Sequence, residues 1–243
     1  MASSVVAFAH TLFSRFLLLL IMIVGFIPAV IFLFLVPAKY RYDNKMYNWC
    51  EYIFYILVLK ATLLKITYKG LENIPHDEPA IIAANHQSSL DIPLIGAMLK
   101  RFPHIWLATI TLMDSPILRF ILPHATVLID MSSPMKGMRS LIQAIQMIHG
   151  KHRHVVLFPE GGRFTDGSVH DFYAGFVILT KKTGRPVVPV RIFGANRAYP
   201  PKVFLINNSP ITVVVGKPLY MQEDEDEEAF KNRVYQWFLE QKE

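Results

Sequence analysis

Cysteine is nearly absent from this chain, and charged residues are scarce. The single cysteine, Cys50, permits no internal disulfide bond, and the chain holds no Cys-rich metal motif. Only 18% of the residues are charged and 52% are hydrophobic, a balance that is too apolar for a typical soluble domain. The sequence also lacks a Gly-x-Ser-x-Gly motif, which argues against a serine hydrolase. These features favour a protein in contact with lipid.

Negative charge is in deficit as well. The formal net charge is +6, although residues 223–228 form a run of acidic side chains. A surplus of positive charge favours anionic partners, which are an acidic membrane surface, a phosphate-bearing substrate or nucleic acid. Because the chain also carries a long apolar segment, we expect membrane lipids and a phosphate-bearing substrate as partners, and no nucleic acid.

The long apolar segment lies near the N-terminus. No residue from Phe16 to Val36 is charged, and a helix of that length spans about 30 Å, the thickness of a bilayer core. Arg15 precedes it and Lys39, Arg41 and Lys45 follow it, so the basic residues predict a catalytic portion on the cytoplasmic face of a membrane. A cleaved signal peptide is the alternative, but the run is too long and lacks an early basic region.

Two features divide this N-terminal segment. Gly25 and Pro28 interrupt the run, and a second apolar stretch, Tyr52–Leu59, follows soon after it. The two stretches predict either one spanning helix with an interfacial helix or a bent helical hairpin that enters one leaflet and returns. We therefore assign residues 1–62 to a membrane-anchoring segment and residues 63–243 to a separate domain.

Beyond residue 60, short β-rich segments alternate with helical ones. Such alternation, with strands that are apolar nearly throughout, predicts an α/β fold in which a mainly parallel or mixed sheet is flanked by helices. The predicted strands are Ile66–Lys69, Ala80–Asn85, Ala125–Asp130, His154–Glu160, Pro186–Gly194 and Ile211–Val215. The predicted helices are Ser89–Lys100, Pro116–Leu122, Pro134–His149 and Tyr173–Lys182, with a C-terminal helix that has Phe230, Val234, Trp237 and Phe238 at helical spacing.

Three histidines, His149, His152 and His154, lie close together in the segment HGKHRH. Histidine is a common metal ligand, but these three lack helical ligand spacing and acidic partners. The segment therefore predicts a solvated basic turn rather than a metal site.

The segment AIIAANHQSSLDIPLIG passes from an apolar strand into a polar turn and then into a helix. The turn holds His86, and Asp91 lies near a helix start that Ser88 or Ser89 can cap. An imidazole held by a carboxylate at one ring nitrogen can take a proton from a hydroxyl with the other, which makes the alcohol a nucleophile. The alternative is a histidine satisfied by the backbone and an aspartate that only favours the helix N-terminus.

A second polar turn, in HVVLFPEGGRFTDG, also follows an apolar strand. Ligands bind beyond the carboxyl ends of strands in open parallel sheets, so the two turns are expected to face one crevice. Gly161 and Gly162 let a ligand approach the backbone, and Arg163 offers a fork of donors that suits a phosphate. The alternative is a tight turn with a salt bridge between Glu160 and Arg163.

Together the two turns resemble the glycerolipid acyltransferase family, which includes the 1-acylglycerol-3-phosphate acyltransferases. The block from Asn85 to Asp91 is similar to the family's Asn-His-x-Ser-x-x-Asp, and residues 158–163 are similar to its Phe-Pro-Glu-Gly-Thr-Arg. A late Val-Pro-Val at residues 188–190 also matches, so the resemblance covers about residues 66–217. It implies that residues 63–243 form an acyltransferase domain.

The resemblance implies direct transfer of a fatty acyl group from acyl-CoA or acyl carrier protein to the hydroxyl of a lysolipid. It implies no acyl-enzyme intermediate, no metal ion and no cofactor. His86 would be the general base and Asp91 its partner. The implied substrate-binding residues are Asn85, Ser88, Arg119, Glu160, Gly161, Gly162 and Arg163.

The middle motif departs from the family. Thr109, Arg119 and Met131 align where members have a lysine, a glycine and an arginine that help to bind phosphate. Lysophosphatidate, which would give phosphatidic acid, is the expected acceptor, and another lysophospholipid or a lyso-aminolipid is the alternative because two cations are missing. A lipid-binding homologue without activity and a hydrolase that releases free fatty acid are further alternatives.

Overall fold

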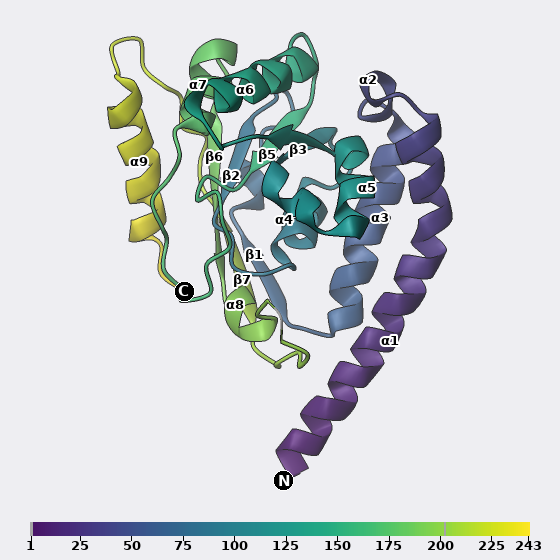
Figure 1. The fold of residues 1–243 in the computed structure, drawn as a ribbon. Helices are drawn as coiled ribbons and strands as arrows, with labels where there is room; N and C mark the ends of the chain where they lie inside the picture. Colours follow the sequence, from purple (N-terminus) through teal and green to yellow (C-terminus); the bar gives the residue numbers. More distant parts are fainter. Residues whose placement is uncertain (1, 202) are drawn as a thin grey trace.

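A seven-stranded mixed sheet lies at the centre of the computed structural model, which describes residues 2–201 and 203–243 (Figure 1). The strands are β1 (Ile66–Lys69), β2 (Ile81–Ala84), β3 (His104–Thr109), β4 (Thr126–Ile129), β5 (His154–Leu157), β6 (Val187–Phe193) and β7 (Ile211–Val215). They lie in the order β1-β7-β6-β2-β5-β3-β4, and all neighbours pair in parallel except β6 and β7. The predicted α/β fold with a mainly parallel or mixed sheet is confirmed.

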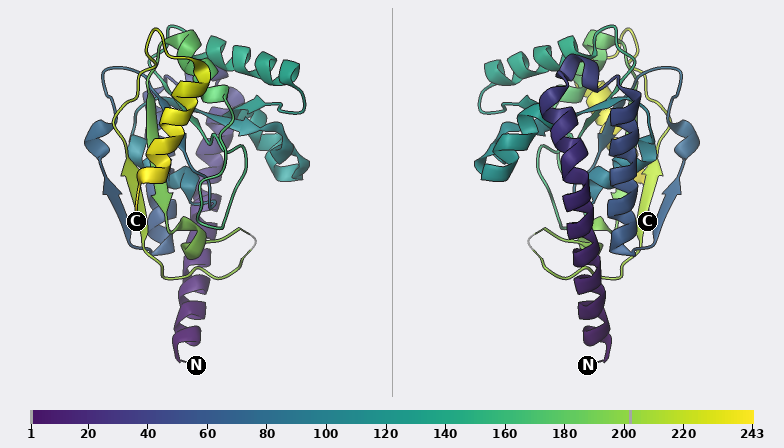
Figure 2. Two further views of the ribbon diagram at one scale, coloured as in Figure 1. Left: turned by 90° about the vertical axis from the view of Figure 1, so that its left-hand side faces the viewer. Right: turned by 90° about the vertical axis from the view of Figure 1, so that its right-hand side faces the viewer.

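Helices cover both faces of the sheet. They are α1 (Ala2–Val30), α2 (Ala38–Arg41), α3 (Lys45–Thr62), α4 (Asp91–Leu99), α5 (Pro116–Ala125), α6 (Pro134–Ile148), α7 (Gly175–Thr183), α8 (Ala195–Ala198) and α9 (Glu227–Glu240), with short 3-10 turns at Leu71–Asn73 and Ile110–Asp114. Helices α3 and α4 pack on one face, and α6, α7 and α9 pack on the other. Helix α1 extends past the rest of the molecule at its N-terminal end (Figure 2).

The structure adds β3 to the predicted strands, and the other predicted elements agree with it to within a few residues. Polar residues stand at both ends of β3, His104 and Thr109, so the apolar run between them is short. The segment is a strand because it pairs with both β5 and β4, which buries Ile105 and Trp106. Only the neighbouring strands supply these partners, and local pattern did not reveal them.

The histidine-rich segment before β5 is only in part the solvated turn that its composition predicted. His154 is completely buried, and its Nδ1 accepts a hydrogen bond from the amide of Ala80 at 2.9 Å. Burial lowers the pKa of His154 to about 3, so the ring is neutral. Arg153 is buried beside it and donates to Asp43 at 2.7 Å. The prediction was therefore wrong for Arg153 and His154, which are buried where β5 begins, and right for residues 149–152, which are exposed.

Strand β2 separates two hydrophobic cores. Ile82 and Ala84 pack toward α3 and α4, whereas Ile81 and Ala83 pack toward α6, α7 and α9. All four side chains are completely buried. A strand that is covered on both faces cannot alternate apolar and polar residues, which explains the continuous apolar run before His86.

Helices α1 and α3 form a helical hairpin along one side of the molecule (Figures 1 and 2). Helix α1 ends in a π-helical stretch, Ile31–Leu35, whose last carbonyl groups have no partner within the helix. The buried side chain of Arg41 satisfies them and also reaches α5. It donates to the carbonyls of Phe32 at 3.0 Å, Leu33 at 2.8 Å and Val36 at 3.1 Å, and to that of His124. One guanidinium thus fastens the hairpin tip to α5.

Helix α3 packs tightly against Gly96 of α4 through the ring of Tyr55. A Cβ atom there would lie 2.1 Å and 2.2 Å from ring carbons of Tyr55. We expect Gly96→Ala to lower the free energy of unfolding by about 1–3 kcal/mol, because the buried ring has no room to move. Gly137→Ala in α6 is the matched control, since its nearest atom would be 3.6 Å away and the change improves helix propensity. Denaturant unfolding in detergent compares the two, and equal effects would contradict this account.

Candidate active site

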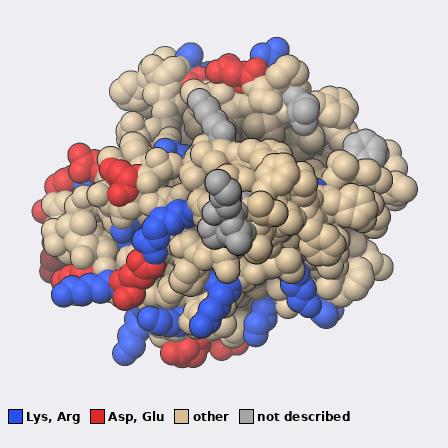
Figure 3. Space-filling view, turned by 90° about the horizontal axis from the view of Figure 1, so that it is seen from below, with Lys and Arg blue, Asp and Glu red and all other residues tan. Residues whose placement is uncertain are grey.

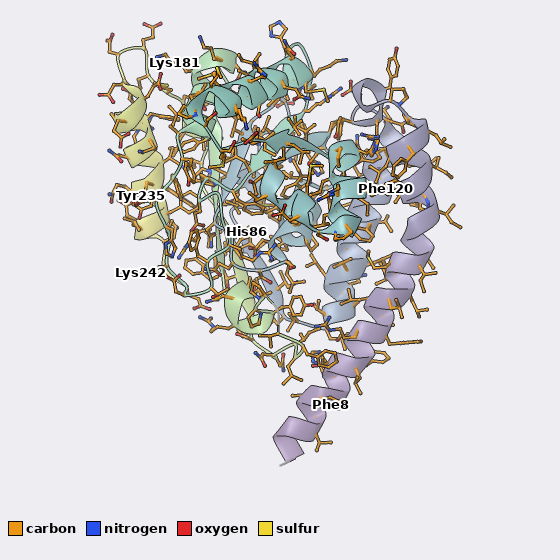
Figure 4. All side chains as sticks on the ribbon, in the orientation of Figure 1. Phe8, His86, Phe120, Lys181, Tyr235 and Lys242 are labelled. Carbon is orange, nitrogen blue, oxygen red and sulfur yellow. The ribbon has the colours of Figure 1, made fainter. Side chains whose placement is uncertain are left out.

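The two polar turns lie side by side at the carboxyl ends of β2 and β5. These strands are parallel neighbours in the sheet, so the chain leaves both at the same edge. The turn after β2 carries His86, and the turn after β5 carries residues 158–163. Figure 4 shows His86 in the middle of the molecule, with Phe120 of α5 on the side of α1. Residues of both turns line one cavity, as expected from the two motifs.

His86 and Asp91 form a hydrogen-bonded pair. Nδ1 of His86 lies 2.8 Å from Oδ2 of Asp91, the first residue of α4, and the aspartate is completely buried. The same oxygen accepts the amides of Gln87 at 2.5 Å and Ser88 at 2.7 Å. Since an ionised carboxylate can only accept, Nδ1 carries the hydrogen and Nε2 of a neutral ring presents its lone pair.

Two further contacts, besides the hydrogen bond to Asp91, define the position of the His86 ring. The ring stacks on Phe158 with centroids 3.9 Å apart and planes at 13°. Its Nε2 accepts a hydrogen bond from Nε of Arg163 at 3.2 Å. The imidazole is 13% exposed, so it is reachable from outside while three neighbours hold its orientation.

Glu160 fastens the two turns to each other. Its Oε1 accepts the amide of His86 at 2.9 Å, and its Oε2 accepts the amide of His170 at 3.0 Å. Burial raises the pKa of Glu160, and the two amide donors partly oppose that rise. The amide of Phe164 also donates to the carbonyl of His86 at 2.9 Å. The Glu160 carboxylate is thus occupied by the backbone of both turns, which fixes where the base lies.

Asn85 and Ser88 are likewise engaged by the scaffold. The side chain of Asn85 exchanges two hydrogen bonds with the backbone of Ile192 in β6, at 2.6 Å and 3.1 Å. Oγ of Ser88 donates to the carbonyl of Tyr199 at 2.6 Å. Both residues are completely buried. They hold the end of β2 against β6 and the segment after α8.

Arg119 lies apart from the other predicted site residues. It is exposed on α5, and its Nε donates to the carbonyl of Met113 at 2.9 Å. The structure brings together His86, Asp91 and the residues from Glu160 to Arg163. The other two positions of the altered middle motif, Thr109 and Met131, contribute to a cavity beside them.

An apolar cavity of about 930 Å³ opens beside His86. Its walls come from α1 and its π-helical end, α3, β3, α5 and the two turns. Among the described residues that line it, Arg163 is the only lysine or arginine. A cavity of this size and character suits a long hydrocarbon chain, with one guanidinium and one imidazole at its polar end.

The cavity wall contains one buried polar network that sequence patterns did not predict. Oε1 of Glu51 accepts hydrogen bonds from the hydroxyls of Tyr47 at 3.2 Å and Tyr55 at 3.1 Å. Nε1 of Trp106 donates to the Tyr55 hydroxyl at 3.2 Å. This network joins α3 to β3. The one available signal was Glu51 itself, a charged residue directly before an apolar stretch.

Position 161 requires a glycine, because of its backbone conformation and because of the space that its neighbours leave. Its φ is +64°, and a Cβ atom there would lie 2.5 Å from the ring of Tyr173. We expect Gly161→Ala to shift the turn that carries Glu160 and Arg163 relative to His86 and to reduce catalytic activity by about tenfold or more, because a shift of about 1 Å in a site has effects of this size. Gly150→Ala is the matched control, since φ is also +64° but nothing lies within 4 Å. Rates and melting temperatures of both variants are measured, and equal losses of activity would refute the steric explanation.

Comparison with known proteins identifies the family. Over residues 65–193 the chain matches the family model described as Acyltransferase. The chain belongs to the acyltransferase family. The matched region contains both polar turns, including His86, Asp91 and the residues from Glu160 to Arg163.

Several curated acyltransferases are similar in sequence. The chloroplastic 1-acyl-sn-glycerol-3-phosphate acyltransferase of Arabidopsis thaliana is 31% identical over 159 residues, which cover 64% of this chain and 44% of that protein. The 1-acyl-sn-glycerol-3-phosphate acyltransferase of Pseudomonas aeruginosa is 26% identical over 189 residues, which cover 77% and 72% of the two chains. The chain spans about half the length of the plant relatives that it matches.

The fold is also that of a solved acyltransferase. The crystal structure of the 1-acyl-sn-glycerophosphate acyltransferase from Thermotoga maritima superposes with a TM-score of 0.75 at 23% identity. The match covers 97% of this chain and 94% of that one. It includes the N-terminal hairpin as well as the sheet, so the whole arrangement of this chain occurs in that fold.

Proposed function

We propose that this protein transfers a fatty acyl group from a thioester to the free hydroxyl of 1-acylglycerol-3-phosphate, with His86 as the general base. The observation that carries the proposal is the pair of His86 and Asp91 at the polar end of a large apolar cavity, beside Arg163. The names of the relatives in the same family support this acceptor.

The reaction follows from the geometry of the pair. Nε2 of His86 takes the hydroxyl proton as the alcohol oxygen attacks the thioester carbonyl carbon. Asp91 holds the ring by Nδ1 and stabilises the imidazolium that forms. When the carbon–sulfur bond breaks, the thiolate of acyl-CoA or acyl carrier protein leaves and receives the proton. Transfer is direct, so the protein's main tasks are positioning the substrates and moving one proton.

Few lysine or arginine side chains would be available to bind the acceptor's head group in the cavity. Thr109 and Met131 line the cavity where the family carries a lysine and an arginine, and Arg163 remains as the guanidinium that faces it. A single bidentate guanidinium is enough to orient one phosphate. The same observation favours the second candidate acceptor, another lysophospholipid or a lyso-aminolipid, over acceptors that bear more negative charge.

Residues 1–62 would embed in a membrane as a hairpin in one leaflet, and residues 63–243 would form the acyltransferase domain on its cytoplasmic face. Among the described residues, one helix, Val5–Gly25, is long and apolar enough to cross, and its mean hydropathy is 2.0. However, Thr11 accepts the amide of Ile206, and Arg15 donates to the carbonyl of Phe204. A crossing helix would carry that irregular loop into hydrocarbon, which is unfavourable.

The surface of the molecule supports an interfacial position. Seen from below, Lys and Arg side chains flank a broad area without charge (Figure 3). Apolar side chains of α1, such as Val5, Phe8 and Phe16, are more than half exposed. Basic side chains beside an apolar area suit a surface of anionic lipid. In this position the cavity opens near the acyl chains of both substrates.

Acyl transfer by the purified protein in vesicles tests the proposal. Labelled acyl-CoA and acyl carrier protein thioester are each offered with lysophosphatidate, other lysophospholipids and lyso-ornithine lipid. We expect a labelled two-chain product that depends on the acceptor, with lysophosphatidate preferred. Lipid binding without transfer to any acceptor would indicate a lipid-binding protein without activity. Free fatty acid as the main product with every acceptor would indicate a hydrolase.

A further inference from the structure

The nitrogen that must accept the substrate proton is already engaged. Nε2 of His86 lies 3.2 Å from Nε of Arg163 and accepts its hydrogen. Because Nδ1 is held by Asp91, Nε2 is the one ring nitrogen that a hydroxyl could use. A lone pair shared with a guanidinium is not available to take a proton. Acyl transfer therefore requires Arg163 to leave this nitrogen.

Arg163 can move without disturbing the rest of the site. The backbone around it is fixed, since the Glu160 carboxylate and the amide of Phe164 both bind the backbone of His86. The Arg163 side chain itself is exposed, and within the described part of the chain its hydrogen bond goes to His86 alone. Of the three hydrogen bonds described between the two turns, this one alone comes from an exposed side chain that a ligand in the cavity could draw away.

An anionic head group is the partner that would replace it. A guanidinium–phosphate pair joins two opposite charges and can form two parallel hydrogen bonds, whereas the bond from Arg163 to His86 is single and goes to an imidazole nitrogen. Arg163 is also the only lysine or arginine among the described residues that line the cavity. A phosphate that enters the polar end would therefore draw this guanidinium away from Nε2.

We propose that Arg163 is a positioning residue that makes the base available only when an anionic acceptor is bound. This inference rests on the proposed function. The same contact keeps water from using His86 when no acceptor is present. In that side reaction a water oxygen attacks the thioester carbon, its proton passes to Nε2, the carbon–sulfur bond breaks, and the thiolate takes the proton, which leaves free fatty acid and thiol.

The test compares Arg163→Met with wild type in vesicles, using one acyl-CoA. Three rates are measured: transfer to lysophosphatidate, transfer to uncharged monoacylglycerol, and hydrolysis without an acceptor. We expect Arg163→Met to raise KM for lysophosphatidate while hydrolysis and transfer to monoacylglycerol rise about tenfold, the size of effect given by one hydrogen bond to a charged group. Inorganic phosphate should stimulate hydrolysis by wild type and leave the variant unchanged.

Controls separate this role from simple phosphate binding. If Arg163 only binds phosphate, the variant loses transfer to lysophosphatidate while the other two rates stay at the wild-type level, and the inference is overturned although the proposed function stands. No transfer by wild type to any acceptor would overturn both. His86→Ala/Arg163→Met should abolish the added hydrolysis, and its persistence would show that another group is the base. Arg139→Met, an exposed arginine on α6, should leave all three rates unchanged.

Discussion

Replacing His86 with alanine is expected to lower the rate of acyl transfer by about 10²- to 10⁴-fold, the contribution of a general base. The loss should fall on kcat, because the cavity and Arg163 still bind both substrates. Initial rates at saturating acyl-CoA and acceptor measure the effect. The change also removes the ring that stacks on Phe158, so thermal unfolding is followed in parallel.

His170→Ala provides the matched control for His86→Ala. His170 lies in the loop after β5, and its ring bonds to Asp166 at 2.9 Å and is not part of the cavity lining. Its contribution to the site is the backbone amide that binds Glu160, which the substitution keeps. We expect this variant to retain most of the wild-type rate. If the two variants lost activity equally, or if His86→Ala remained active with intact fold, His86 would not be the base.

Asp91→Asn is expected to reduce the rate on the order of a hundredfold or more while the protein still folds. The amide oxygen can replace Oδ2 and accept the same three hydrogen bonds, from Nδ1 of His86 and the amides of Gln87 and Ser88. What is lost is the negative charge that stabilises the imidazolium formed during transfer. The new amide nitrogen would take the place of Oδ1, which is buried without a partner. We expect this to cost about 1–3 kcal/mol of stability.

A double variant shows whether the two residues act as one unit. If Asp91 works only through His86, then His86→Ala/Asp91→Asn should be no slower than His86→Ala alone. Losses that multiply would instead mean that Asp91 has an independent role, which would contradict the proposed pair. Chemical denaturation of the single and double variants checks that rates are compared between folded proteins.

Residue patterns along the chain were sufficient for most of the helices and strands and for the positions of the two polar turns. Continuous apolar strands followed by polar turns predicted a buried sheet with a crevice at one edge, and His86 and Arg163 lie there. Strand β3 and the burial of His154 could not be predicted in this way. Both are surrounded by strands that are distant in sequence. The hydrophobic periodicity within a segment does not show which distant strands pair with it.

Long-range hydrogen bonds engage several of the residues that the sequence predicts to bind substrate. Asn85 and Ser88 flank His86 in the first turn, and Glu160 lies in the second. From sequence alone, these polar residues cannot be told apart from groups that contact a substrate. In the folded chain the backbone occupies all three, through partners up to 111 positions away. A polar group in a buried turn needs a hydrogen-bond partner, and here the backbone of distant segments supplies it.

The cavity beside His86 could not be predicted from the sequence, because tertiary packing alone forms it. Its walls include Pro28 of α1, Tyr47 of α3 and Trp106 of β3, which come together only when the N-terminal hairpin packs against the sheet. The apolar composition of the N-terminal segment indicated contact with lipid, because composition reports how much surface avoids water. It did not indicate that the same hairpin would complete the space beside His86, because the shape of a cavity depends on packing between segments that are not neighbours in the chain.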